Sequence, residues 1–157
     1  MLSVVFVCLG NICRSPSAEG VFQALVDAAE LSAQISVDSA GTGGWHVGDP
    51  PDGRAMRVGK ERGYDLSAQR ARQFQMSDFE KFDYVVAMDH SNFENLRRMV
   101  PEHFSGELGL MLDYAGRIGE EVPDPYYGGI EDYHHVFDLL KPAASGLLAH
   151  IRETHNI

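Results

Sequence analysis

A cysteine and an arginine separated by five residues stand near the start of the chain, in the C-x5-R-S pattern of Cys8, Arg14 and Ser15. Gly10 and Asn11 lie between them, and both residue types tolerate the positive φ angles that a tight loop requires. A loop whose N–H groups point inward, closed by the N-terminus of a helix, binds the charged oxygens of a phosphoryl group. The pattern therefore predicts an anion-binding loop with a thiol at its base.

The side chains of this loop suit phosphoryl transfer. The guanidinium of Arg14 offers two parallel donors that match two phosphoryl oxygens. The field that attracts phosphate also favours a thiolate on Cys8, which can attack phosphorus in line and form a phosphocysteine intermediate. The Ser15 hydroxyl is expected to bond the sulfur and ease its departure. The alternative is a buried space-filling cysteine beside a solvated arginine, which the joint pattern and its strand–loop–helix setting disfavour.

One carboxylate stands out as a proton donor for the leaving group. Asp124 lies between Pro123 and Pro125, which stiffen the chain, and Tyr126 and Tyr127 follow it. A leaving alkoxide or phenoxide needs a proton, which a carboxylic acid can supply. A Pro-Asp-Pro bend is also a common turn, and only together with the cysteine loop does the pattern favour a general acid.

Apolar patterning predicts the elements that position these residues. Ser15 and Pro16 are typical of an N-cap and a first helical residue. Strands are predicted at 2–8, 35–38, 83–88 and 108–112, and helices after Ser15 and at 52–62, 76–82, 90–99 and 130–151. This alternation predicts a single α/β domain over residues 1–157: a three-layer sandwich with a four-stranded parallel sheet, flavodoxin-like or Rossmann-like. Loops after the carboxyl ends of its strands would meet at one edge, where ligands bind.

Composition narrows the class of protein. The chain has 157 residues, of which 44% are hydrophobic and 23% charged, as expected for a globular domain with a core. The formal net charge of -10 disfavours nucleic acid as a partner. No apolar stretch is long enough for a membrane span. The N-terminus lacks the basic segment of a signal peptide, and the two cysteines are too few for a disulfide scaffold, so we expect a cytoplasmic protein.

Four sequence motifs together resemble the low-molecular-weight protein tyrosine phosphatase family. They are V-C-L-G-N-I-C-R-S-P at 7–16, S-A-G-T at 39–42, A-M-D-x-S-N at 87–92 and D-P-Y-Y at 124–127, in family order. The resemblance covers essentially the whole chain. Other cysteine phosphatases that share C-x5-R usually carry a histidine just before the cysteine, where this chain has Val7.

The resemblance implies hydrolysis of phosphotyrosine on protein substrates, without metal or cofactor, in a monomer or weak dimer that phosphate or vanadate inhibits. It assigns Cys8 as nucleophile, Arg14 as phosphate clamp and Asp124 as acid and then base. It also makes Asn11 a strained residue braced by Ser15 and Ser39. The phosphate- and substrate-binding residues are then Leu9, Gly10, Asn11, Ile12, Cys13, Ser15, Trp45, Tyr126 and Tyr127, the three aromatic residues forming the wall for a phenyl ring.

Four positions leave alternatives open. Gln69 stands where family members often have a histidine that joins the brace, so the supporting network is altered here. The resemblance implies that Cys13 forms a reversible disulfide with Cys8, the alternative being a buried thiol under the loop. Asp89 follows a predicted strand and could be taken for a second acid, but we interpret it as a structural residue that bonds loop backbone. Trp45 could instead only cap a loop.

Two other functions are compatible with such a fold. An arsenate reductase shares this loop, but its thioredoxin-coupled form needs cysteines later in the chain, and none follows Cys13. A glutaredoxin-coupled form stays open. A phosphate- or flavin-binding module without catalysis should lack the nucleophile, the arginine or the acid, yet all three residue types are present.

Overall fold

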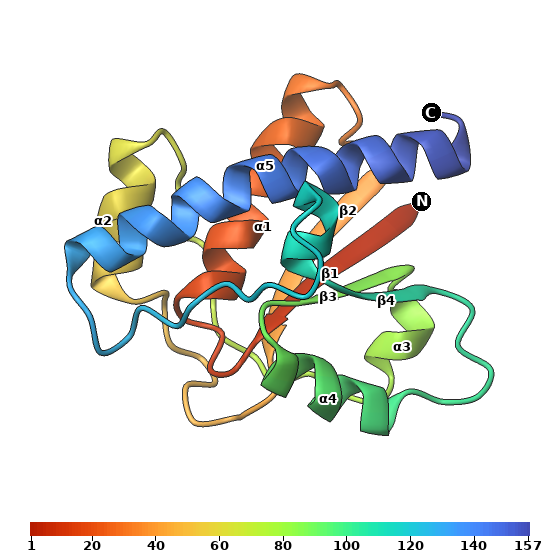
Figure 1. Cartoon of the computed structure of the whole chain (residues 1–157), viewed down its shortest axis with the longest axis horizontal. Helices are drawn as coiled ribbons and strands as arrows, with labels where there is room; N and C mark the ends of the chain where they lie inside the picture. The colour runs from red at the N-terminus through yellow and green to blue at the C-terminus, as the bar shows by residue number, and fades with distance from the viewer.

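The computed structural model describes residues 1–157 and contains a four-stranded parallel sheet in the order β2-β1-β3-β4 (Figure 1). The strands are β1 (Leu2–Cys8), β2 (Ile35–Gly41), β3 (Tyr84–Ala87) and β4 (Glu107–Leu110). The predicted α/β class with a four-stranded parallel sheet is confirmed.

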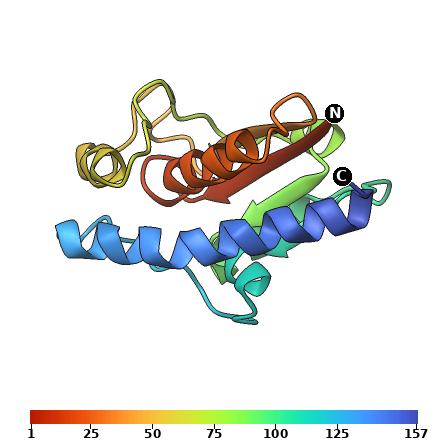
Figure 2. The same cartoon turned by 90° about the horizontal axis from the view of Figure 1, so that it is seen from above.

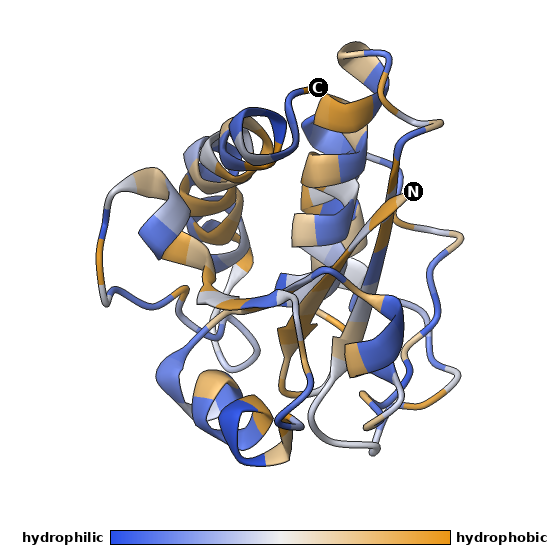
Figure 3. Ribbon diagram, turned by 90° about the vertical axis from the view of Figure 1, so that its right-hand side faces the viewer, coloured by the Kyte–Doolittle hydropathy of each residue, from blue (hydrophilic) through white to orange (hydrophobic).

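Helices cover both faces of the sheet, which gives the predicted three layers (Figure 3). They are α1 (Arg14–Ala28), α2 (Gly53–Glu61), α3 (Asp78–Lys81), α4 (His90–Met99) and α5 (Ile130–His155), with the 3-10 helix η1 (Met111–Ala115) after β4. α1 and α5 pack together on one face, and α5 extends along most of the molecule (Figure 2). α3 and α4 contribute to the core on the other face. None of the helices combines the length and apolar composition needed to cross a bilayer.

Strand β1 lies in the interior of the sheet and is buried on both sides. Val4 and Phe6 point into the core beneath α1 and α5, whereas Val5 and Val7 point into the core beneath α3 and α4. All four side chains are fully buried. Successive side chains of a strand face opposite sides, so a strand covered twice must be apolar throughout, as this run is.

Several local predictions are wrong: the predicted strand 35–38 continues to Gly41, and the predicted helix 130–151 continues to His155. Helix α1 begins at Arg14, and the N-cap is Cys13 instead of Ser15, whose hydroxyl lies within hydrogen-bond distance of the Cys8 sulfur. The predicted strand 108–112 ends at Leu110, and the last two residues belong to η1. A short apolar run does not distinguish a buried strand from a buried helical turn.

The carboxyl ends of the strands form one edge of the sheet. Cys8 lies opposite Gly41, and Val7 lies opposite Ala87. The chain passes from β1 to β2 on one side and then to β3 on the other, so the strand order reverses beside β1. In open α/β sheets, ligands bind in the crevice at such a switch point, and Cys8 is placed there.

Candidate active site

The phosphate loop (residues 8–15) joins β1 to α1. It contains Asn11 in the left-handed region with φ 58, which bends the backbone around a concave centre. The sulfur of Cys8 lies 3.0 Å from the Ser15 hydroxyl oxygen. The first turn of α1 holds no acidic residue, so the positive end of its dipole faces the loop uncompensated. The loop therefore favours an anion at its centre.

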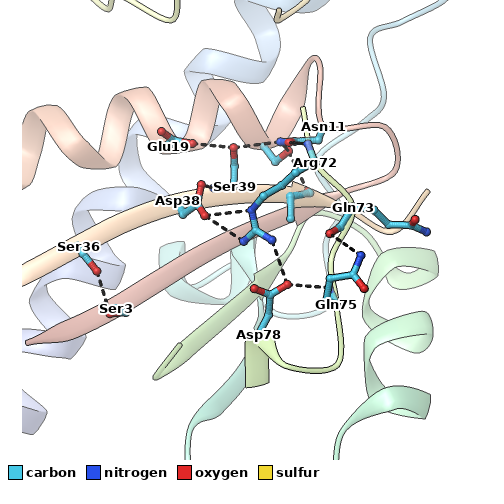
Figure 4. Close-up of polar contacts among 12 residues, drawn as sticks. Ser3, Asn11, Glu19, Ser36, Asp38, Ser39, Arg72, Gln73, Gln75 and Asp78 are labelled. Atoms are coloured by element: carbon cyan, nitrogen blue, oxygen red, sulfur yellow. Dashed lines mark hydrogen bonds and ion pairs between the residues drawn. The ribbon is translucent and has the colours of Figure 1, made fainter. Parts of the chain in front are cut away.

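Three hydrogen bonds fix the Asn11 side chain beneath the loop. Its Nδ2 donates to the hydroxyl oxygens of Ser15 at 2.8 Å and Ser39 at 3.0 Å, and its Oδ1 accepts from the backbone N–H of Arg72 at 3.0 Å. Figure 4 shows the Ser39 contact. Gly41 lets the loop pack closely, because a Cβ there would lie 2.7 Å from the Leu9 carbonyl oxygen. The strained backbone of Asn11 is thus held by both its side chain and its surroundings.

The brace extends to a residue that sequence reasoning missed. The Ser39 hydroxyl donates to Glu19 Oε1 at 2.7 Å (Figure 4). Burial raises the pKa of Glu19 to about 7, against the lowering effect of the Ser39 hydrogen bond. Nearby, the guanidinium of Arg72 bonds Asp38 and Asp78. The sequence offered little signal, since a glutamate on an amphipathic helix usually faces solvent.

Gln69 is not part of the hydrogen-bond network that braces Asn11, although its position in the sequence predicted that it would be. Its Nε2 donates to the carbonyl oxygen of Pro16 at 3.0 Å, and its Oε1 is buried without a hydrogen-bond partner. It makes no hydrogen bond to Asn11, Ser15 or Ser39. Gln69 therefore supports the backbone of α1, and the brace consists of the other side chains.

Arg14 is only 2% exposed, and its hydrogen bonds hold it in one orientation. Its Nη1 donates to Asp89 Oδ2 at 2.7 Å and to the carbonyl oxygen of Val122 at 2.9 Å, and its Nη2 lies 3.7 Å from Asp124 Oδ2. Burial opposes its charge, yet the acidic groups around it, Cys8 and Asp89 first among them, raise its pKa. The guanidinium thus stays positive at the pocket.

Asp89 does more than bond loop backbone. One carboxylate oxygen accepts from the backbone N–H of Asn92 at 2.8 Å and caps helix α4, while the other fixes Arg14. A residue expected to be structural is therefore also the main partner of the predicted phosphate clamp. An aspartate directly before a predicted helix is typical of an N-cap, but the partner 75 residues away leaves no signal in the sequence.

The Asp124 loop (residues 122–129) lies at the surface. Asp124 has a side chain that is 43% exposed, and its Oδ1 accepts from the backbone N–H of Tyr126 at 3.1 Å in an Asx turn. Tyr126 is 39% exposed and Tyr127 is 95% exposed. The Val122 N–H donates to the Met88 carbonyl at 2.9 Å, which anchors the start of the loop near β3.

A pocket of about 240 Å³ brings the two loops together. It is lined by Cys8, Leu9, Gly10, Ile12, Cys13, Arg14, Trp45, His46, Asp124, Tyr126 and Tyr127. Asn11, Ser15 and Ser39 are buried outside this lining, and Gln69 and Asp89 do not line it either. Sequence reasoning missed His46, whose position beside Trp45 was the available signal. The arrangement places a thiol, a guanidinium and a carboxylate around one small anion-sized space.

The family follows from comparison with known proteins. Residues 3–156 match the sequence profile described as low molecular weight phosphotyrosine protein phosphatase. The chain belongs to this family. It is 47% identical to a putative low molecular weight protein-tyrosine-phosphatase of Synechocystis sp., with 94% of each chain covered. It is therefore a phosphatase, a hydrolase of the protein tyrosine phosphatase type.

Solved structures agree with this family and its fold. A protein tyrosine phosphatase from Entamoeba histolytica, crystallised with Hepes in its active site, is 40% identical and superposes with a TM-score of 0.94, with 99% of each chain covered. A drosophila arginine phosphatase is 32% identical, with a TM-score of 0.89 and 95% and 97% of this and that chain covered. Members with this fold thus include proteins named for two different phosphorylated side chains.

The second cysteine of the phosphatase, Cys13, belongs to the phosphate loop and is buried. Cys13 Sγ is 3.3 Å from the Tyr133 hydroxyl, and burial raises the pKa of this thiol to about 12. Cys13 therefore stays protonated at neutral pH. Both cysteines are free thiols in the structure, and the reversible disulfide between them stays a prediction.

Proposed function

We propose that this phosphatase hydrolyses phosphotyrosine on proteins through a phosphocysteine intermediate. In this mechanism Cys8 is the nucleophile, Arg14 clamps the phosphoryl group and Asp124 is the general acid and then the base. The observation that carries the proposal is the single pocket in which the Cys8 thiol, the buried Arg14 guanidinium and the Asp124 carboxylate converge.

The first step transfers the phosphoryl group to sulfur. The phosphate loop and the N-terminus of α1 bind the dianion, and Arg14 donates two parallel hydrogen bonds to its oxygens. The Cys8 thiolate attacks phosphorus in line, forming the S–P bond as the P–O bond to the leaving group breaks. Asp124 gives its proton to the departing oxygen, so that a neutral phenol leaves.

The second step returns the enzyme to its starting state. The Asp124 carboxylate takes a proton from a water molecule whose oxygen attacks phosphorus. The S–P bond breaks with its electron pair on sulfur, and inorganic phosphate is released. The Ser15 hydroxyl, 3.0 Å from the sulfur, and the positive end of α1 stabilise the departing thiolate.

The rim of the pocket supports an aromatic substrate. Trp45, Tyr126 and Tyr127 line it, and the rings of the two tyrosines pack edge to face with centroids 5.0 Å apart. A phenyl ring that packs against this rim gains aromatic contacts that an aliphatic phosphoserine lacks. We also propose that the chain acts as one domain, as a monomer or weak dimer, in the cytoplasm, where cysteines stay reduced.

The mechanism is tested with p-nitrophenyl phosphate in the presence of EDTA, at acidic pH, for the wild type and Cys8→Ser. We expect turnover by the wild type, inhibition by vanadate, and no turnover by Cys8→Ser, although that variant still binds phosphate. Circular dichroism checks that Cys8→Ser is folded. Freshly reduced wild type without turnover would contradict the proposal and favour a binding module.

The substrate class is tested with peptides of one sequence that carry phosphotyrosine, phosphoserine or phosphoarginine. We expect kcat/KM for phosphotyrosine to exceed the others by roughly 100-fold. A preference for phosphoarginine would leave the cysteine chemistry standing and replace the proposed substrate. Thiol-dependent reduction of arsenate, measured on the same preparation, would revive the reductase alternative.

A further inference from the structure

The Asp124 loop depends on one arginine from another part of the chain. Arg54, at the start of α2, donates from Nη2 to the carbonyl oxygen of Tyr126 and from Nη1 to that of Gly128, both at 2.9 Å. The guanidinium also lies against the Tyr126 ring, 5.7 Å from its centroid. These contacts span 72 and 74 residues of sequence, so they fix the loop relative to α2.

Arg54 is itself held in place by its neighbours. Its backbone N–H and Nε donate to Asp52 Oδ1 at 2.8 Å and 3.1 Å, and its Nη2 donates to Asp52 Oδ2 at 3.0 Å. The guanidinium stacks over the Tyr133 ring at 4.8 Å from the centroid. Burial of Asp52 opposes its charge, but the hydrogen bonds from Arg54 dominate and lower its pKa. The planar fork of an arginine can satisfy all these acceptors together, which a lysine cannot do.

The same pair is tied to the phosphate loop. The backbone N–H of Asp52 donates to the carbonyl oxygen of Ile12 at 2.8 Å. On the other side, the carbonyl of Tyr126 accepts from Arg54 while the N–H of Tyr126 donates to Asp124 Oδ1. A continuous series of hydrogen bonds therefore runs from the phosphate loop through Asp52 and Arg54 to the carboxylate of Asp124.

We propose that Arg54 is a positioning residue that holds Asp124 at the correct distance from the phosphate loop for proton transfer. Arg54 is absent from the pocket lining, so its effect on the reaction passes through the Asp124 loop. This role rests on the proposed function of Asp124 as general acid. Loss of the Arg54 side chain keeps the backbone bond between Asp52 and Ile12 of the phosphate loop but releases the backbone that orients the Asp124 carboxylate.

The test compares Arg54→Ala and Arg54→Lys with the wild type, using kcat/KM for two aryl phosphates. Phenyl phosphate has a poor leaving group that requires a proton, whereas 2,4-dinitrophenyl phosphate does not. We expect both variants to lose roughly tenfold to 100-fold with phenyl phosphate, because misplacing a reacting group by about 1 Å costs that much. With 2,4-dinitrophenyl phosphate and in vanadate affinity, we expect changes below about threefold.

Arg57→Ala is the matched control. Arg57 lies on the same helix, is 66% exposed, and pairs with Glu61 instead of the Asp124 loop. We expect this variant to keep wild-type values for both substrates. Thermal unfolding of all variants verifies their fold. Arg54→Lys is included because it keeps the positive charge, so the test stands even if Arg54→Ala destabilises α2.

A double-mutant cycle with Asp124→Asn isolates the route of the effect. We expect Arg54→Ala to cause no further loss in the Asp124→Asn background. If Arg54→Ala caused its full loss of kcat/KM in the Asp124→Asn background, or slowed both leaving groups equally, the positioning role of Arg54 would be overturned. The general acid role of Asp124 would then still stand. If Asp124→Asn by itself slowed both leaving groups equally, the general acid and the positioning role would fall together.

Discussion

The two loops of the pocket are built in opposite ways. In the phosphate loop, Arg14, Asn11 and Ser15 are at most 3% exposed, and hydrogen bonds to polar side chains and backbone groups hold each of them. In the Asp124 loop, Asp124 is 43% exposed, and the loop is held by its backbone carbonyls. One loop is part of the folded core, and the other is attached to it.

This difference matches the two tasks that we propose for the loops. Stabilising the charge of a transferring phosphoryl group requires donors whose positions do not change, and a buried, fully bonded loop provides that preorganisation. Delivering a proton requires only one carboxylate near the leaving oxygen, and an exposed loop leaves room for a protein substrate to approach. The comparison implies that damage to the phosphate loop should cost both stability and activity, whereas damage to the Asp124 loop should cost activity alone.

The largest separation of activity from stability is expected for Asp124→Ala. We expect kcat/KM for phenyl phosphate to fall roughly 100- to 10,000-fold, the usual contribution of general acid catalysis. The loss with 2,4-dinitrophenyl phosphate should be far smaller. Because the side chain is exposed, the free energy of unfolding in urea should change by less than about 0.5 kcal/mol. A large loss of stability would contradict the contrast between the loops.

Replacing Asn11 should affect both quantities. Asn11→Ala removes three hydrogen bonds, two of them buried, so we expect the free energy of unfolding to fall by roughly 3 kcal/mol. We expect kcat/KM to fall by the same factor for phenyl and 2,4-dinitrophenyl phosphate, since the defect lies in phosphoryl binding. Asn156→Ala is the control, because Asn156 has φ 55 but is exposed. Urea unfolding should show a change of about 1 kcal/mol or less there.

The outer end of the brace should give the phosphate loop a pH-dependent stability. Burial raises the pKa of Glu19 to about 7 from an ordinary 4.5, so the folded state binds the proton more tightly than the unfolded state. The free energy of unfolding contributed by Glu19 is therefore complete below pH 4.5 and is lost as the pH rises to about 7. Glu19→Gln keeps the acceptor for Ser39 but has no proton to lose. It should therefore lack the decrease in free energy of unfolding with rising pH, which is on the order of 1–2 kcal/mol in the wild type after allowance for solvent screening.

The measurement for Glu19 is urea unfolding of the wild type and Glu19→Gln at about pH 5 and about pH 8. Glu80→Gln serves as the control because its carboxylate is exposed on α3. If the free energy of unfolding changed equally between the two pH values for Glu19→Gln and the wild type, Glu19 would not be the source of the pH-dependent stability.

The smallest effect is expected at the rim. Tyr127 is 95% exposed, so Tyr127→Ala should leave stability within about 0.5 kcal/mol. Loss of one aromatic contact should raise KM for a phosphotyrosine peptide by roughly twofold to tenfold, with kcat unchanged. Steady-state kinetics with the peptide measure this. A fall in kcat instead would mean that Tyr127 contributes to the chemical step, and would contradict the assignment of the rim to substrate binding only.

Local patterns in the sequence predicted the parts of the site that local chemistry defines. The C-x5-R-S run indicated the phosphate loop because its residue types and its strand–loop–helix setting are contiguous. The buried run at 2–8 predicted β1 with its observed bounds. Ser15 misled the N-cap prediction because the same hydroxyl that caps helices also bonds the Cys8 sulfur.

Local patterns did not predict residues whose hydrogen-bond partners are far away in the sequence. Glu19, Arg54 and Arg72 look like ordinary charged residues of amphipathic or polar segments, and their partners lie on other elements. Asp52 was predicted as the first residue of a helix and is instead the N-cap of α2, and its bonds to Arg54 and Ile12 appear only in the folded chain. Tertiary hydrogen bonds leave no periodic signal in a single sequence.

The partners that orient Arg14 have a consequence for synthesis on the ribosome. The thiol-bearing loop is translated early, but Asp89 and Val122 follow Arg14 by 75 and 108 residues. Until those residues emerge, the guanidinium lacks the acceptors that aim it, and the loop cannot be completed. A growing chain therefore carries the proposed nucleophile before its site is assembled, and we expect phosphatase activity only after most of the polypeptide has been made.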